Sequence, residues 1–201
     1  MKESPKKKII ILKKKQAGTG SADDGLIRLN KYISNAGVCS RRDADKLIGE
    51  GLVTVNGEVV TELGRKVSLD DEVCFDGKQL NPEKKVYLLL NKPKGFATTV
   101  DDPHVDRTVM QLVEGACKER IYPVGRLDMQ TTGLLLFTND GELAKKLTHP
   151  SYEREKIYHV QLDKDLAPDD LIRIKKGFDL EVGFIAADDV QMIDPDDYRQ
   201  V

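Results

Sequence analysis

The chain has 201 residues, of which 39% are hydrophobic and 33% charged, enough for two small domains with buried cores. The formal net charge is −2, Trp is absent and aromatic residues make up 5%, which argues against a broad aromatic platform for single-stranded nucleic acid. The longest apolar run near the N-terminus, Ile9 to Leu12, is too short for a signal peptide core or a membrane span. We therefore expect a cytoplasmic protein with no membrane partner.

Cysteines and histidines are too few and too scattered to predict a metal centre. The three cysteines, an odd number, include no CxxC pair, which argues against a disulfide framework and a zinc ribbon and favours a reducing compartment. None of the three histidines has the spacing of a metal ligand. We expect no metal site.

Residues 1–25 are rich in lysine, with seven lysines and one glutamate among the first twenty. A run of small and polar residues follows at 17–21. This composition predicts a disordered basic arm. Two interpretations stay open: the arm attracts nucleic-acid phosphate, or it is a solubilising tail.

Residues 26–80 have the pattern of a small domain that begins with two helices. Leu29, Ile33 and Ala36 recur at helical spacing in the first helix. The second helix is expected to begin after Ser40, whose side chain can cap it together with Asp43, and to run to about residue 50.

A hairpin follows the helices. Asn56-Gly57 separates two apolar runs at 52–55 and 58–60, which is a strong hairpin signal. A further strand is expected within 67–75. The polar connection at 76–85 contains glycine, proline and lysines, so we place a domain boundary within it, after residue 80.

Basic side chains gather on and beside the two helices. The five cations are Arg28, Lys31, Arg41, Arg42 and Lys46. An ordinary solvated face would have the same composition, but cations in the first turn of the second helix oppose the helix dipole, and a phosphate ligand would offset that cost.

The order of residues in this region resembles a known domain. The stretch 27–48, IRLNKYISNAGVCSRRDADKLI, followed by GLVTVNG at 51–57, resembles the S4-type RNA-binding domain. The resemblance implies a small S4-type α/β domain in which these five cations contact folded RNA.

Residues 81–201 have the pattern of a larger domain. Apolar or alternating runs at 86–90, 134–138 and 157–162 predict strands, and 142–147 predicts a short helix. Strands and helices follow no regular βαβ rhythm, so we expect an α+β fold with a largely antiparallel mixed sheet.

The most informative segment is 123–141, PVGRLDMQTTGLLLFTNDG. Asp128 and Arg126 lie in a loop between Gly125 and a hydrophobic strand that begins after Gly133. Such a loop can hold a carboxylate at the edge of a sheet, within reach of a substrate. From spacing alone, an aspartate that caps its own turn is the better explanation of the pattern.

Three motifs resemble those of RNA pseudouridine synthases. Gly-Arg-Leu-Asp at 125–128 with Thr-Gly-Leu-Leu-Leu after it resembles the catalytic motif, and Thr-Asn-Asp-Gly at 138–141 resembles the branch that modifies ribosomal RNA, the RsuA/RluB type. Asn-Lys-Pro-Lys-Gly at 91–95 and Lys-Ile-Tyr-His-Val at 156–160 resemble the other two family motifs.

The resemblance implies a cofactor-free isomerisation of a uridine flipped out of its RNA. Asp128 is then the reacting carboxylate, as nucleophile or as base, and Arg126 helps to displace the base. Tyr158 matches the tyrosine that stacks on uracil, although a core tyrosine on a strand is an alternative. Lys92 and Lys156 match substrate contacts, which we expect to be RNA phosphates. The expected partner is ribosomal RNA, bound by a monomer.

Two further expectations concern completeness and activity. The family carries an arginine-rich motif after this point, and the chain ends at Tyr198-Arg199-Gln200-Val201 without it. We therefore expect residues 81–201 to be an incomplete catalytic domain, and this form to be poorly active or inactive. The alternative function is a non-catalytic RNA-binding or ribosome-assembly factor, which has no need of Asp128.

Overall fold

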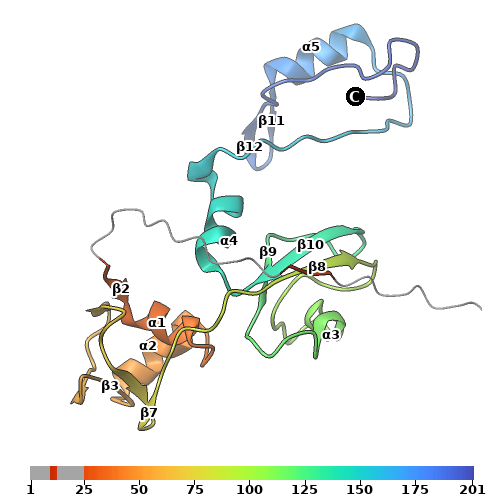
Figure 1. Ribbon diagram of the computed structural model, residues 1–201. Helices are drawn as coiled ribbons and strands as arrows, with labels where there is room; N and C mark the ends of the chain where they lie inside the picture. Colours follow the sequence, from red (N-terminus) through yellow and green to blue (C-terminus); the bar gives the residue numbers. More distant parts are fainter. Residues whose placement is uncertain (1–9, 13–24) are drawn as a thin grey trace, which may run out of the picture. The chain divides into compact units, whose positions relative to one another are not determined.

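The computed structural model describes residues 10–12 and 25–201 and divides the chain into two compact units, residues 1–153 and 154–201 (Figure 1). The described elements form an α+β fold, and all of their strand pairs are antiparallel, as predicted. None of the helices in the described part of the chain is long and apolar enough to cross a membrane.

Residues 25–80 contain two helices and six short strands. The elements are β2 (Ile27–Arg28), α1 (Leu29–Asn35), α2 (Arg41–Gly49), β3 (Val53–Val55), β4 (Glu58–Val59), β5 (Lys66–Val67), β6 (Val73–Phe75) and β7 (Lys78–Gln79). The strands form a sheet with the order β4-β3-β6-β7 and a separate β2-β5 pair. Ile33, Ala44, Val53 and Val73 belong to the core between helices and strands.

Local signals explain several of these elements. The Ser40 hydroxyl accepts a hydrogen bond from the Asp43 N–H at 3.2 Å and begins α2 as predicted. Asn56 and Gly57 have φ angles of 52° and 83°, which suit the tight turn between β3 and β4. The strand predicted within 67–75 is divided into β5 and β6.

Residues 86–153 contain the larger sheet. The elements are β8 (Tyr87–Lys92), α3 (Met110–Val113), β9 (Tyr122–Val124), β10 (Gly133–Thr138), α4 (Gly141–Thr148) and the 3₁₀ helix η1 (Pro150–Tyr152). With β1 (Ile10–Leu12), the sheet order is β1-β8-β10-β9, and Leu88, Leu135 and Phe137 lie in its core.

The predicted basic arm differs from the structure at one point. Ile10–Leu12 form β1, which pairs antiparallel with β8 at Tyr87–Leu89. Pairing satisfies backbone groups that an edge strand would leave open. Residues 1–9 and 13–24 of the predicted arm lie outside the described residues.

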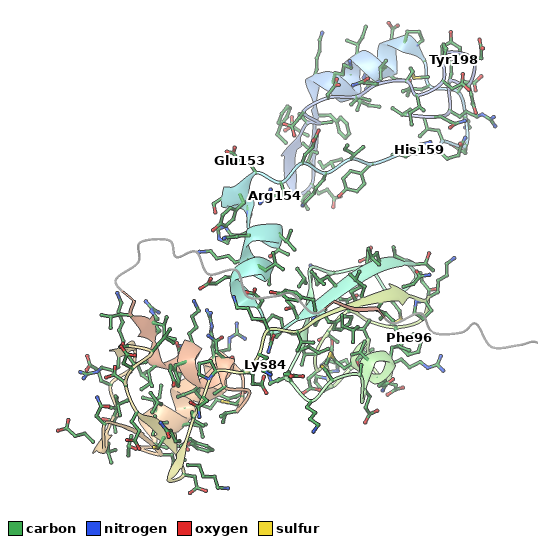
Figure 2. The ribbon with its side chains drawn as sticks, viewed as in Figure 1. Lys84, Phe96, Glu153, Arg154, His159 and Tyr198 are labelled. Atoms are coloured by element: carbon green, nitrogen blue, oxygen red, sulfur yellow. The ribbon has the colours of Figure 1, made fainter. Side chains whose placement is uncertain are left out.

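The second unit, residues 154–201, contains α5 (Pro168–Lys176), β11 (Phe178–Leu180) and β12 (Gly183–Ile185). None of its residues, all of which the structure describes, is buried. The strand predicted at 157–162 is wrong in extent, because this segment is paired only around an isolated bridge between Gln161 and Gln200, where Val160 and Leu162 exchange backbone hydrogen bonds with residues 199–201. His159 and Tyr198 project from this unit in Figure 2.

Candidate active site

Asp128 lies in the loop that joins the end of β9 to the start of β10. Its side chain is exposed, and among the described residues its carboxylate accepts no hydrogen bond and forms no ion pair. Arg126, two residues earlier, is also exposed. The loop therefore presents one anionic and one cationic side chain to solvent.

A buried lysine donates hydrogen bonds to the backbone carbonyls of this loop. Nζ of Lys92 donates hydrogen bonds to the carbonyl oxygens of Asp128 and Thr131, each at 2.8 Å. The carbonyl oxygens of Pro93 and Met129 lie 3.3 Å from the same nitrogen. Because the Lys92 side chain is fully buried, these carbonyls replace the water that its charge has lost.

Lys92 is consequently not the RNA contact that the sequence predicted. Its ammonium group points into the protein, and its donors are occupied. Burial lowers the pKa of Lys92, and the nearby negative charge of Asp128 partly opposes this. Strand alternation could have revealed its direction, because Leu88, Leu90 and Lys92 share the buried side of β8.

A threonine braces the same loop from another side. The Thr98 hydroxyl donates to the Leu127 carbonyl at 2.6 Å, and it accepts from the Leu127 N–H at 3.2 Å. The Gly95 N–H donates to the Met129 carbonyl at 2.8 Å. Nothing in the sequence singled out Thr98, which is 29 residues away from its partner. The backbone on both sides of Asp128 is thus fixed while its side chain stays accessible.

The residues just after Gly95 pack beside this loop. The guanidinium of Arg107 lies 5.3 Å from the centre of the Phe96 ring, and Figure 2 labels Phe96 near the end of β8. A cation–π contact at an exposed site contributes about 0.5–1 kcal/mol. It adds to the support of the segment that carries Thr98.

The other predicted substrate contacts belong to the second unit. Lys156 and Tyr158 lie in the extended segment that begins at Arg154, and both side chains are exposed. Tyr158 is 74% exposed, so it is not a core tyrosine within its own unit. The roles of both residues stay predictions.

The five predicted RNA-binding cations fall into two groups. Arg28, Arg41 and Arg42 are exposed. Lys46 forms an ion pair with Asp43 at 2.9 Å, and Lys31 forms one with Glu142 at 3.0 Å. An acidic partner reduces the attraction of a cation for phosphate, so the three arginines are the stronger candidates.

The described residues hold no group of three or more histidine, cysteine or carboxylate side chains that could bind a metal ion. The charged groups at this loop are the Asp128 carboxylate, the Arg126 guanidinium and the buried Lys92 ammonium. A fixed carboxylate at a solvent-facing loop can act on a sugar as nucleophile or base and can stabilise positive charge that develops there.

Two families match the chain. The RNA pseudouridylate synthase model matches residues 86–194, and the S4 domain model matches residues 27–73. The first match includes Asp128 and its supporting lysine, and the second includes the five cations.

Relatives agree with these matches. An uncharacterised RNA pseudouridine synthase of Aquifex aeolicus is 45% identical, over 83% of this chain and 68% of its own length. The ribosomal large subunit pseudouridine synthase B of Bacillus subtilis is 44% identical, over 86% of this chain and 70% of its own.

A solved structure is also similar. A crystal structure of a pseudouridylate synthase has a TM-score of 0.51 and 30% identity, covering 87% of this chain and 75% of that one. These matches and the fold lead to one assignment. The chain belongs to the RNA pseudouridine synthase family of isomerases and carries an S4-type RNA-binding domain.

Proposed function

We propose that the protein converts one uridine of large-subunit ribosomal RNA to pseudouridine, with Asp128 as the reacting carboxylate. The observation that carries this proposal is the exposed Asp128 side chain on a backbone fixed by Lys92 and Thr98. The similarity to the ribosomal large subunit pseudouridine synthase B of Bacillus subtilis supports the choice of RNA.

The reaction needs no cofactor because its atoms balance within the nucleoside. The bond between ribose C1′ and uracil N1 breaks, the base turns, and C1′ bonds to C5. C5 loses its proton, and N1 gains one. Asp128 reacts at the sugar, where a carboxylate can also stabilise developing positive charge.

The target uridine has to leave its helix before a carboxylate can reach the sugar and the base can turn. We assign the displacement of the base to Arg126, which is exposed two residues from Asp128. Tyr158 stacks on the extruded uracil and Lys156 contacts a neighbouring phosphate. Both side chains are exposed, as such contacts require.

The S4-type domain supplies affinity for folded RNA. Arg28, Arg41 and Arg42 offer guanidinium groups suited to phosphate oxygens. Lys31 and Lys46 contribute less, because each has an acidic partner.

Comparison of ribosomal RNA from cells with and without the gene tests this function. Pseudouridine mapping is expected to show one large-subunit position that loses its mark on deletion. The gene restores the mark, as does the control variant Asp179→Asn, which changes an exposed carboxylate on β11. Asp128→Asn should not restore it. A full mark with Asp128→Asn would refute the proposal.

A further inference from the structure

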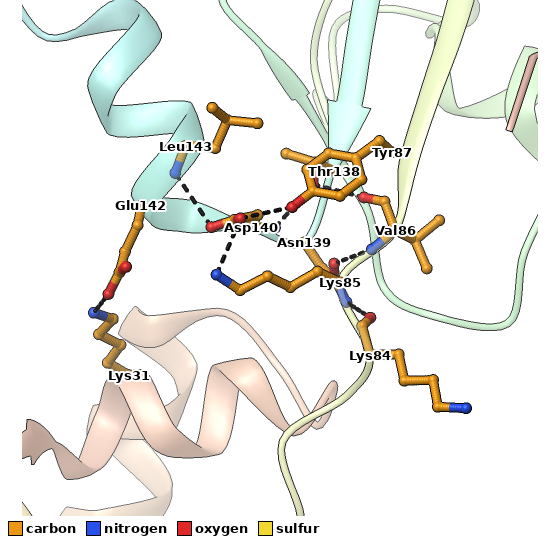
Figure 3. A network of polar contacts seen from close by, with 10 residues as sticks. All are labelled: Lys31, Lys84, Lys85, Val86, Tyr87, Thr138, Asn139, Asp140, Glu142 and Leu143. Carbon is orange, nitrogen blue, oxygen red and sulfur yellow. Dashed lines mark hydrogen bonds and ion pairs between the residues drawn. The ribbon is translucent and has the colours of Figure 1, made fainter. Parts of the chain in front are cut away.

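Residues 83–87 connect the RNA-binding and catalytic parts of residues 25–153, and hydrogen bonds hold this connection in place. The Val86 N–H donates to Oδ1 of Asn139 at 2.8 Å, and Nδ2 of Asn139 donates to the Lys84 carbonyl at 2.8 Å (Figure 3). One amide thus binds the backbone on both sides of Lys85. A connection between domains more often has few such contacts.

The residues on either side of Asn139 hold the same connection. The Thr138 hydroxyl donates to the Val86 carbonyl at 2.6 Å. Oδ2 of Asp140 accepts from the Tyr87 hydroxyl at 2.8 Å and lies 3.0 Å from Nζ of Lys85 (Figure 3). Thr138 and Asp140 are both buried, so these bonds are largely shielded from competing water.

Asp140 also joins the connection to a helix. Its Oδ1 accepts from the Leu143 N–H at 3.2 Å and caps α4. The next residue but one, Glu142, forms an ion pair with Lys31 of α1 at 3.0 Å (Figure 3). The start of α4 therefore contacts both the connection and an RNA-binding helix.

Glu83 links the two parts from within the connection. Its N–H donates to the Asn35 carbonyl at the end of α1, at 2.8 Å. Its carboxylate accepts from the Arg120 N–H, just before β9, at 3.3 Å. Side chains of both parts also lie close to Gly141. A Cβ added there would lie 3.0 Å from the Tyr122 hydroxyl oxygen and 4.0 Å from Nη2 of Arg41.

We propose that Thr138–Glu142 is a rigid joint that holds the S4-type domain at a fixed position relative to the catalytic sheet, and that this fixed position selects the RNA substrate. The joint sets the separation between the cations of α2 and Asp128. An RNA that presents its phosphates and its uridine at that separation binds both sites, and no conformational entropy of the connection is lost when it binds. The selectivity part rests on the proposed function; the rigidity part does not.

Backbone ¹⁵N relaxation of the whole chain tests rigidity without RNA. Amides of residues 27–80 and 86–148 are expected to share one rotational correlation time. Asn139→Ala removes both amide bonds, and Glu142→Lys replaces the ion pair with repulsion. The combined variant should show a shorter correlation time for residues 27–80 alone. The charge-reversal control Glu114→Lys, at an exposed residue after α3, should leave a single correlation time.

Charge exchange gives a second test that does not depend on the stability of one variant. Lys31→Glu and Glu142→Lys should each loosen the joint, and the double exchange should restore the shared correlation time. Two correlation times in the unaltered protein, or one in the combined Asn139→Ala, Glu142→Lys variant, would overturn the joint. Failure of the double exchange to restore coupling would remove Lys31–Glu142 from it.

Turnover tests selectivity. Asn139→Ala should lower kcat/KM on a folded ribosomal RNA fragment by about ten- to a hundredfold, because small misplacements far from the chemistry can cost that much. A short hairpin with the same uridine should be affected much less. Equal losses on both RNAs would overturn selection by the joint. An unchanged pseudouridine pattern in ribosomal RNA from cells without the gene would refute the proposed function, while the relaxation result would still decide rigidity.

Discussion

The catalytic loop and the basic face of the S4-type domain differ in how firmly their charged side chains are positioned. At Asp128 the backbone is fixed by a buried cation, and one side chain reaches solvent. On the helices, Arg41 and Arg42 are exposed and Lys46 is paired with its neighbour Asp43. Bond-making chemistry needs position, whereas attraction of phosphate needs charge that can adapt.

Removal of the buried cation should produce the largest effect on stability. Lys92→Met leaves buried carbonyls without donors, and we expect it to lower the free energy of unfolding by about 3 kcal/mol. Activity should fall about a hundredfold as the loop loses its position. Urea denaturation and turnover measure the two effects.

The chain offers a matched control for this change. Lys94 is exposed two residues away, so Lys94→Met should alter stability by about 0.5 kcal/mol or less. Equal stability of the two variants would show that the buried hydrogen bonds do not support the loop.

Neutralisation of the basic face should reduce affinity without changing the chemistry. In the double variant Arg41→Gln, Arg42→Gln, the slope of log affinity against log salt concentration should become shallower by about 1 to 2. This is the change expected for two lost phosphate contacts. Lys46→Gln should change the slope less, because Asp43 lies 2.9 Å from Lys46. An unchanged slope in the double variant would exclude these arginines as RNA contacts.

The smallest effect concerns pH. Burial raises the pKa of Asp140, but hydrogen bonds from the Leu143 N–H, Lys85 and Tyr87 outweigh it, so the net pKa lies below the ordinary value of 3.8. The ionised carboxylate therefore stabilises the fold above pH 3.8, and this stability is lost as the pH falls from 3.8 through the lowered pKa.

Asp140→Asn tests the sign of this effect. The substitution should cost about 1 kcal/mol at pH 7, since the amide can still cap α4 but has no charge for Lys85. The difference from the unaltered protein should shrink in acid, as measured by urea denaturation at several pH values. A difference that grows in acid would contradict the lowered pKa. The hydroxyl of Tyr87, whose pKa burial and Asp140 raise to about 12, stays protonated throughout this range.

Local signals in the sequence predicted local structure. Ser40 with Asp43 predicted the start of α2, and Asn56-Gly57 predicted the hairpin of β3 and β4, because each signal acts within a few residues. Asp128 was selected by resemblance, and the structure adds an exposed side chain on a braced backbone.

Non-local contacts explain what the sequence missed. The alternation of β8 indicates the buried direction of Lys92, but the carbonyls that replace the water around its charge come from residues up to 39 positions away and cannot be read from the sequence. Thr98 and Asn139 act on partners 29 and 53 residues distant, and neither interaction leaves a periodic pattern. At 157–162 the alternation predicted a strand, yet the pairing is limited to one bridge, between Gln161 and Gln200, and the backbone hydrogen bonds beside it.

The most direct test of the central claim measures chemistry and binding on the same preparations. Release of tritium from RNA labelled at uridine C5 reports loss of the C5 proton. With Asp128→Asn, release should fall by about a thousandfold or more, as expected when the reacting group is lost. RNA affinity should remain within a few-fold. Undiminished release would contradict the account, because the carboxylate of Asp128 would then not be the reacting group.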